Sequence, residues 1–301
     1  MNSILSVQQV SKHYGDYTAV NNISFELKPG QLFGLLGPNG AGKTSLIRMM
    51  TTITSIDEGS IFFNQEKINS DTPGLIGYMP EERGLYKKMK VGDQLLYLAQ
   101  LKGLSKKEAK AKIQSWLDRF EINDWWNKEI NELSKGMQQK IQFISTVVHE
   151  PKLLILDEPF SGLDPINTNL IKSEIFRLKE AGTTIIFSTH RMEQVEEICE
   201  EIMLVNKGRA ILKGNLQEIR NQYKKNLYEI TLDQAPADLS NLPGNIKEQV
   251  DNQIIIHLED DAMSNEILSF FTKQGIRIRS FKEILPSLNE IFIQSVEEVE
   301  A

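Results

Sequence analysis

The chain has 301 residues, 40% of them hydrophobic and 25% charged, with a formal net charge of −7. These values are typical of one large or two ordinary globular domains and exclude disorder, collagen and disulfide scaffolds. The single cysteine, Cys199, excludes an internal disulfide, favours a reducing compartment and is expected to be a buried filler. The acidic charge disfavours a nucleic-acid partner. No apolar run approaches the roughly 20 residues of a membrane helix.

The first 80 residues predict strands followed by a helix. Apolar residues alternate or cluster over 4–10, 23–27 and 31–36, as in strands. The third run ends in a glycine-rich loop, and residues 44–51 have helical character.

A mostly helical insert is expected next, at about 88–150. Apolar residues recur at helical spacing over 91–101 and 106–120. The insert holds all three tryptophans, which we expect to pack rather than contact a ligand: Trp116, Trp125 and Trp126.

Alternating strands and helices follow the insert. Strands are expected at 153–156 and 184–188, helices at 167–179 and 192–199, and a hairpin at 202–213. This alternation predicts an α/β fold with a largely parallel sheet.

A boundary is expected near 218–226, where the sequence is polar and charged before the apolar pattern restarts. The last part predicts strands at 227–232, 253–258 and 276–281, and helices at 263–273 and 286–295. We therefore predict a first domain at 1–219 and a small α+β domain at 226–301.

Residues 37–44 match the phosphate-binding loop G-x-x-x-x-G-K-[ST], between an expected strand and an expected helix. Glycines let the backbone wrap closely, so that amide N–H groups and the helix N-terminus meet phosphate oxygens. Lys43 should reach the β- and γ-phosphates, and Thr44 should place its hydroxyl on Mg²⁺. The expected nucleotide contacts are Gly37, Pro38, Asn39, Gly40, Ala41, Gly42, Lys43, Thr44 and Ser45.

Residues 153–158, with the sequence LLILDE, supply adjacent carboxylates at the end of a buried strand. Asp157 would hold Mg²⁺, as in P-loop NTPases. Glu158 would orient or deprotonate the attacking water.

In this order the motifs resemble an ATP-binding subunit of an ABC transporter, from residue 1 to about 217. Tyr14 lies where that family has an aromatic residue that stacks on adenine. Residues 133–137, LSKGM, lie where the family has its Leu-Ser-Gly-Gly-Gln signature. Residues 161–164, SGLD, resemble the D-loop, and residues 188–190, STH, resemble the switch segment. The resemblance implies a P-loop NTPase core with an antiparallel β subdomain and a helical insert.

The resemblance also implies an ATP site shared between two subunits. Each subunit would bind ATP through its own loop, and the signature of the second would close over the γ-phosphate. The implied contacts across the interface are Ser134, Lys135, Gly136, Met137 and Asp164. Glu158, Lys43 and His190 would be the catalytic residues, with His190 near the γ-phosphate and the attacking water.

Two positions depart from the family pattern. The signature has Lys135 and Met137 where glycine and glutamine are usual, and Lys135 either adds positive charge there or points to solvent. Glu81 stands where the family has the Q-loop glutamine. A carboxylate can bind Mg²⁺ but cannot donate as an amide does, so Glu81 is expected to keep a metal contact while altering coupling.

The expected function is that of an ATPase subunit that binds ATP and Mg²⁺ and powers transport through a separate membrane permease. The ending 286–292, PSLNEIF, resembles the C-terminal extension of bacterial exporter ATPases of the sodium or drug efflux kind. Residues 82–89 are expected to border the groove for a permease helix. The expected partners are a second copy of this chain and the permease, with no nucleic acid. The chain would lie in the cytoplasm, on the inner face of the membrane.

Two alternatives remain. A soluble ABC ATPase acting on ribosomes, RNA or DNA would need either a second cassette or a long coiled coil between the ATP motifs. This chain has one phosphate loop and about 100 residues between Lys43 and the signature. An inactive ATP-binding regulator is disfavoured because Lys43, Asp157, Glu158 and His190 are all present.

Overall fold

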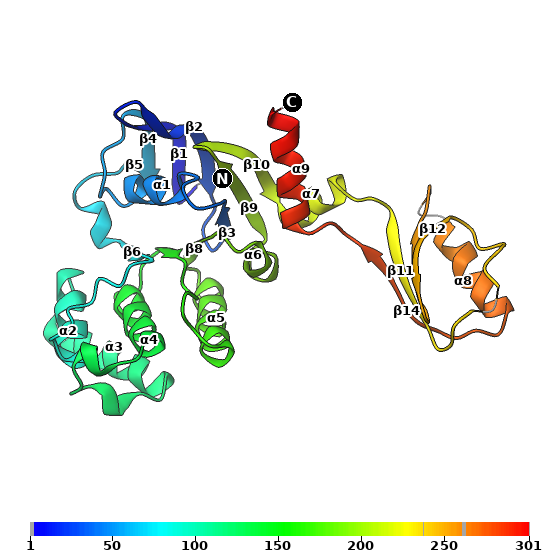
Figure 1. Cartoon of the computed structure of the whole chain (residues 1–301). Coiled ribbons are helices and arrows are strands. Elements are labelled where there is room, and N and C mark those ends of the chain that lie inside the picture. The colour runs from blue at the N-terminus through cyan, green and yellow to red at the C-terminus, as the bar shows by residue number, and fades with distance from the viewer. Residues whose placement is uncertain (1–2, 237, 261–262, 301) are drawn as a thin grey trace. The chain divides into compact units, whose positions relative to one another are not determined.

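The computed structural model describes residues 3–236, 238–260 and 263–300 (Figure 1). The chain divides into two compact units, Met1–Gly214 and Asn215–Ala301. Within the described residues, no helix is both long and apolar enough to span a bilayer.

A six-stranded sheet forms the centre of the first unit, in the order β10-β9-β3-β8-β7-β6. Its inner strands pair in parallel, and β3, β7 and β8 are buried along their whole length, which explains their apolar runs. The strands are β3 (Leu32–Leu36), β6 (Ile76–Met79), β7 (Leu153–Asp157), β8 (Thr184–Thr189), β9 (Glu201–Asn206) and β10 (Arg209–Asn215). Helices α1 (Lys43–Met50), α5 (Pro165–Glu180) and α6 (Met192–Ile198) follow β3, β7 and β8.

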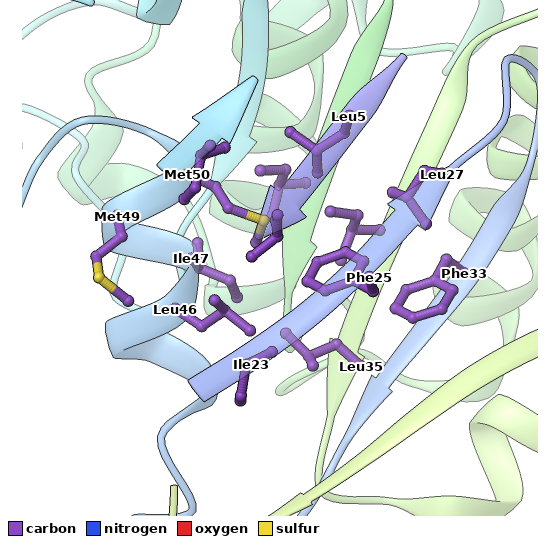
Figure 2. Close-up of a cluster of buried hydrophobic side chains, with 14 of the residues drawn as sticks. Leu5, Ile23, Phe25, Leu27, Phe33, Leu35, Leu46, Ile47, Met49 and Met50 are labelled. Atoms are coloured by element: carbon purple, nitrogen blue, oxygen red, sulfur yellow. The ribbon is translucent and has the colours of Figure 1, made fainter. Parts of the chain in front are cut away.

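A second, antiparallel sheet has the order β2-β1-β4-β5. Its strands are β1 (Leu5–Tyr14), β2 (Tyr17–Leu27), β4 (Glu58–Phe63) and β5 (Glu66–Lys67). One apolar core joins this sheet to helix α1 and strand β3 (Figure 2). In it the rings of Phe25 and Phe33 stack with centroids 5.3 Å apart. This core supports both ends of the loop between β3 and α1, where the phosphate motif lies.

The helical insert contains α2 (Val91–Leu101), α3 (Lys106–Arg119) and α4 (Lys135–Val147). Ser105 and Glu108 form a capping box that starts α3. The Trp116 ring packs on Phe143 with centroids 5.9 Å apart. Trp126 lies against Gly92, where an added Cβ would come within 2.3 Å of the indole. The prediction that these tryptophans pack is confirmed for Trp116 and Trp126.

The second unit has an antiparallel sheet in the order β12-β13-β11-β14. Its strands are β11 (Leu227–Leu232), β12 (Asn245–Val250), β13 (Gln253–His257) and β14 (Ile278–Ile284). Its helices are α7 (Leu216–Gln222), α8 (Ser264–Lys273) and α9 (Leu288–Glu300). Ile230, Ile254 and Phe271 belong to its separate core.

The division between the units falls before α7, earlier than the expected boundary at 218–226. Asn215 caps α7 by accepting from Gln217 N. From α7, Arg220 donates to the Pro286 carbonyl at 3.0 Å, and the Tyr223 hydroxyl lies 3.2 Å from Ser295 Oγ. These long-range bonds hold α7 in the second unit, although its sequence looks like a linker.

Candidate functional site

The phosphate motif lies on the loop between β3 and α1, and two of its glycines are required by the backbone. Gly37 has φ 147°, and an added Cβ would lie 2.1 Å from the Val205 carbonyl oxygen. Gly42 has φ 109°, and an added Cβ would lie 2.2 Å from the Ala19 carbonyl oxygen. Both positions therefore require glycine, because only a residue without a Cβ fits this backbone and these close contacts.

Lys43 is the first residue of α1 and is nearly buried, at 7% exposure. Its ammonium group donates to the carbonyls of Gly37, at 2.6 Å, and Pro38, at 3.1 Å. Burial lowers the pKa of Lys43, and the carboxylates of Glu158, Asp157 and Glu81 act in the opposite direction. The Lys43 side chain is therefore held at the loop by two loop carbonyls and faces three carboxylates.

A cavity of about 320 Å³ opens beside this loop. Its described lining comprises the loop residues 39–45, Ala19, Tyr14, Tyr17, and the acidic residues Glu81, Asp157 and Glu158. Tyr17, which the sequence analysis missed, donates from its hydroxyl to the Gly40 carbonyl at 3.2 Å. Its only sequence signal was a second aromatic residue three positions after Tyr14.

Asp157 ends β7 and lies beside Thr44 in the cavity lining. The Thr44 hydroxyl lies 3.5 Å from Asp157 Oδ2, and the Ser188 hydroxyl donates to Asp157 Oδ1 at 2.7 Å. Burial raises the pKa of Asp157, partly offset by the Ser188 hydrogen bond. A hydroxyl beside a carboxylate is a donor set that suits Mg²⁺, which keeps several waters and phosphate oxygens as its other ligands. Glu81 lies in the same cavity and is exposed.

Glu158 is held by three donors from the end of β8. Thr189 Oγ1 donates to Glu158 Oε2 at 3.0 Å, and the His190 backbone N–H donates to Oε1 at 2.8 Å. His190 Nδ1 lies 2.6 Å from the same Oε1, so a proton on Nδ1 completes the contact. Glu158 also has φ 50°, a left-handed conformation that costs about 1–2 kcal/mol in a non-glycine residue. Such strain persists only where the surroundings hold the residue firmly.

The signature residues lie outside this cavity. Ser134 caps α4 by accepting from the Met137 N–H at 3.3 Å, and both Ser134 and Lys135 are exposed. Asp164 caps α5 by accepting from the Asn167 N–H at 2.8 Å, and this bond lowers the pKa of Asp164. The described lining of the cavity includes none of Ser134, Lys135, Gly136, Met137 and Asp164.

Gly136 differs from the loop glycines in one respect. An added Cβ would meet its nearest described neighbour, Leu163 Cδ2, at an ordinary 3.6 Å. The described part of this chain therefore leaves room for a side chain at Gly136.

A glycine-rich phosphate loop, a strand-end carboxylate pair and a helical insert with a capped signature helix define an ATP-binding cassette ATPase. An ABC transporter family model matches residues 20–161. A second model, described as the C-terminal domain of DrrA1-3-like ATP-binding proteins, matches residues 214–296. Over 295 residues the chain is 47% identical to the ABC transporter ATP-binding protein YhaQ of Bacillus subtilis, covering 97% of this chain and 98% of that protein. The chain therefore belongs to the ABC transporter ATP-binding proteins, a family of ATPases.

Two further likenesses are informative. The chain is 34% identical to the Nod factor export ATP-binding protein I of Cupriavidus metallidurans, over 73% of each chain. The structure of cbiO1 from Clostridium perfringens, part of the ABC transporter complex cbiONQ, matches with a TM-score of 0.65 and 29% identity. That match covers 74% of this chain and 92% of cbiO1. The expected fold class and family resemblance are confirmed.

Proposed function

We propose that this chain hydrolyses ATP to power export through a separate membrane permease, working as a homodimer. The observation that carries the proposal is the division of the site. The loop and the Glu158 carboxylate share one cavity, whereas the signature on α4 lies outside it. A relative named for Nod factor export supports the direction of transport.

ATP would bind in the cavity beside the loop. Tyr14 would stack on adenine, and the loop amides with Lys43 would hold the phosphates. Thr44 and Asp157, with Glu81, would hold Mg²⁺, which neutralises phosphate charge when bound. Tyr17 would keep the loop in place through its bond to Gly40.

Glu158 would orient the attacking water and accept its proton, since its carboxylate lies in the cavity and is fixed by Thr189 and His190. His190 would contact the γ-phosphate. We expect Glu158→Gln to bind ATP and lose at least about 100-fold in kcat, the lower range for removing a general base. Wild-type turnover in this variant would refute the assignment.

The signature of a second copy would complete the site. The start of α4, with Ser134 and Gly136, would donate to the γ-phosphate, and Lys135, Met137 and Asp164 would lie at the same interface. The room beside Gly136 supports this, because its own chain does not require glycine there. A phosphate that approaches the backbone closely at this position would require glycine.

Gly136→Ala tests the shared site. In the Glu158→Gln background the parent should dimerise with ATP and Mg²⁺, as measured by light scattering. Gly136→Ala should bind ATP equally well yet remain monomeric. Dimerisation of the Gly136→Ala protein with unchanged ATP dependence would contradict the shared site.

The permease would dock on an apolar groove of about 210 Å³ beside the 82–89 loop. Its lining includes Leu85, Leu98 and Leu101, and Leu101 is 64% exposed. Apolar anchors of this kind suit an amphipathic helix. We infer that this contact holds the chain at the inner face of the cell membrane.

Charge reversal tests the docking surface. Lys87→Glu with Lys88→Glu should reduce recovery with membranes and leave ATP binding unchanged. Lys106→Glu with Lys107→Glu is the matched control, since this pair is also exposed and lies at the start of α3. Equal membrane recovery of both double variants would argue against docking at the 82–89 loop.

Co-purification tests the whole proposal. Tagged Glu158→Gln, expressed in the native cell and extracted in mild detergent with ATP and Mg²⁺, should carry a multi-helix membrane protein in near-stoichiometric amount. Tagged Lys43→Ala should co-purify with less of this membrane protein in the ATP-bound dimeric complex. Recovery with ribosomes or nucleic acid instead would favour the soluble ATPase.

A further inference from the structure

Arg83 bridges two segments that are distant from it in sequence. Its Nε donates to Gln139 Oε1 on α4 at 3.1 Å. Its Nη2 lies 3.4 Å from the Ser161 carbonyl, in the turn that follows Glu158. Arg83 follows Glu81 by two residues, so one side chain joins this loop to both α4 and that turn.

Gln139, which is buried at 1% exposure, completes this set of hydrogen bonds. Its amide nitrogen donates to the Pro159 carbonyl at 2.9 Å, while its oxygen accepts from Arg83. The turn at 159–161 is thus held by two side chains that also bond to each other. One turn further along α4, Gln142 donates to the Pro80 carbonyl at 2.8 Å.

This bridge reaches the backbone of Glu158. The Ser161 N–H donates to the Glu158 carbonyl at 3.0 Å, and the Ser161 carbonyl faces Arg83. Glu158 has φ 50°, so its backbone stays in place only because the surrounding bonds hold it. Arg83 and Gln139 bond to the turn that follows Glu158, whereas Thr189 and His190 bond to its carboxylate.

We propose that Arg83 is a positioning residue that holds the turn after Glu158, and through it the Glu158 carboxylate, in the geometry that hydrolysis needs. This inference rests on the proposed role of Glu158 as the base. The guanidinium group suits the task, because its planar fork directs N–H groups at two acceptors at once. A lysine ammonium is a point charge on a flexible stem and lacks that fixed fork.

Steady-state ATPase kinetics of the full-length chain provide the test. We expect Arg83→Ala to lower kcat about tenfold, the size of effect that about 1.4 kcal/mol of lost transition-state stabilisation gives. KM for ATP and nucleotide affinity should stay within about twofold, because Arg83 does not line the cavity beside the phosphate loop and lines only the adjoining one, which shares Thr44, Glu81 and Asp157. Arg83→Lys should recover only part of the loss.

A double-mutant cycle separates positioning from general destabilisation. Arg83→Ala and Gln139→Ala break one bridge, so their kcat losses should multiply to more than the loss in the double variant. Gln138→Ala is the matched control on the same helix, since its amide donates to the carbonyls of Ile130 and Leu133 instead. Its kcat effect should combine independently with that of Arg83→Ala.

Three results would overturn the proposal: unchanged kcat in Arg83→Ala, full recovery in Arg83→Lys, or fully multiplicative losses for Arg83 and Gln139. A kcat loss that only follows a lower melting temperature would assign Arg83 a purely structural role. Glu158→Gln measured alongside keeps the two claims apart. If it is inactive while Arg83→Ala is normal, only the positioning role fails.

Discussion

His149, just after α4, is expected to make the stability of the first unit fall in mild acid. Neither ring nitrogen has a hydrogen bond of good geometry among the described residues. Burial and the positive charge of Lys102 lower the pKa of His149 to about 4, opposed by a weak contact with the Ile76 backbone. Lys102 is itself fixed by donating to the Ile76 carbonyl at 2.9 Å. The folded protein therefore holds this imidazole neutral.

The direction of the pH effect on stability follows from the pKa of His149 in the unfolded and in the folded chain. The unfolded chain binds a proton on His149 below its ordinary pKa of 6.5, whereas the folded chain does so only near 4. The stabilisation is therefore fully present above pH 6.5 and is lost as pH falls toward 4. Between pH 7.5 and pH 5 the loss is about 2 kcal/mol, from about 1.4 kcal/mol per pH unit over the interval below 6.5.

The assay is urea unfolding at pH 7.5 and pH 5, followed by tryptophan fluorescence, because all three tryptophans lie in the first unit. The free-energy difference between wild type and His149→Leu should change by about 2 kcal/mol between the two pH values, with the wild type losing more in acid. Gln142→Leu, beside His149 in the same groove, is the non-titrating control and should show a constant difference. Parallel pH curves for wild type and His149→Leu would refute the reasoning.

Two other substitutions should separate folding from nucleotide binding. Asp157→Asn should abolish turnover yet raise the melting temperature by a few degrees at pH 7, because burial raises the pKa of Asp157 and a neutral amide avoids that cost. The gain should shrink as pH falls toward the ordinary carboxyl range, which scanning calorimetry can follow. Gly42→Ala should lower ATP affinity by about 100-fold or more, roughly 3 kcal/mol, because its Cβ would meet the Ala19 carbonyl. At Gly40 (φ 79°) an added Cβ would have no described atom within 4 Å, so Gly40→Ala should cost backbone strain only and lose less in a fluorescent-nucleotide titration.

The parts of the site that sequence could predict are those built from consecutive residues. Residues 37–44 form one continuous motif, so the loop is recognisable from the sequence even though the atoms that exclude side chains at Gly37 and Gly42 belong to Val205 and Ala19. Asp157 and Glu158 follow a buried strand whose apolar run is unbroken because both faces are covered. Tyr17, Arg83 and Gln139 were missed, since each acts through a bond to a segment elsewhere in the chain.

The unpredicted elements also have physical causes. Every described residue of β12 is exposed, so this edge strand lacks the alternation that marks a half-buried strand. Strand β6 has four residues and contains Gly77, where an added Cβ would lie 2.7 Å from the Thr146 carbonyl. Close packing requires glycine at this position, and glycine is unfavourable inside a strand, so the sequence indicates a strand here only weakly. Such elements become visible only when their neighbours are known.

Glu81 offers a test of how the ATP cavity balances its charge. Its carboxylate shares the cavity with Asp157 and Glu158, and all three favour the charged form of Lys43. Glu81→Gln removes one negative charge and restores an amide donor. We expect the Mg²⁺ concentration for half-maximal ATPase activity to rise about threefold, equivalent to about 0.7 kcal/mol, with little change in kcat at saturating Mg²⁺. Glu82→Gln is the matched control, because Glu82 is adjacent and exposed and lines only the adjoining cavity, not the one that holds Lys43 and Glu158. Identical Mg²⁺ curves for Glu81→Gln and wild type would show that Glu81 takes no part in holding the metal.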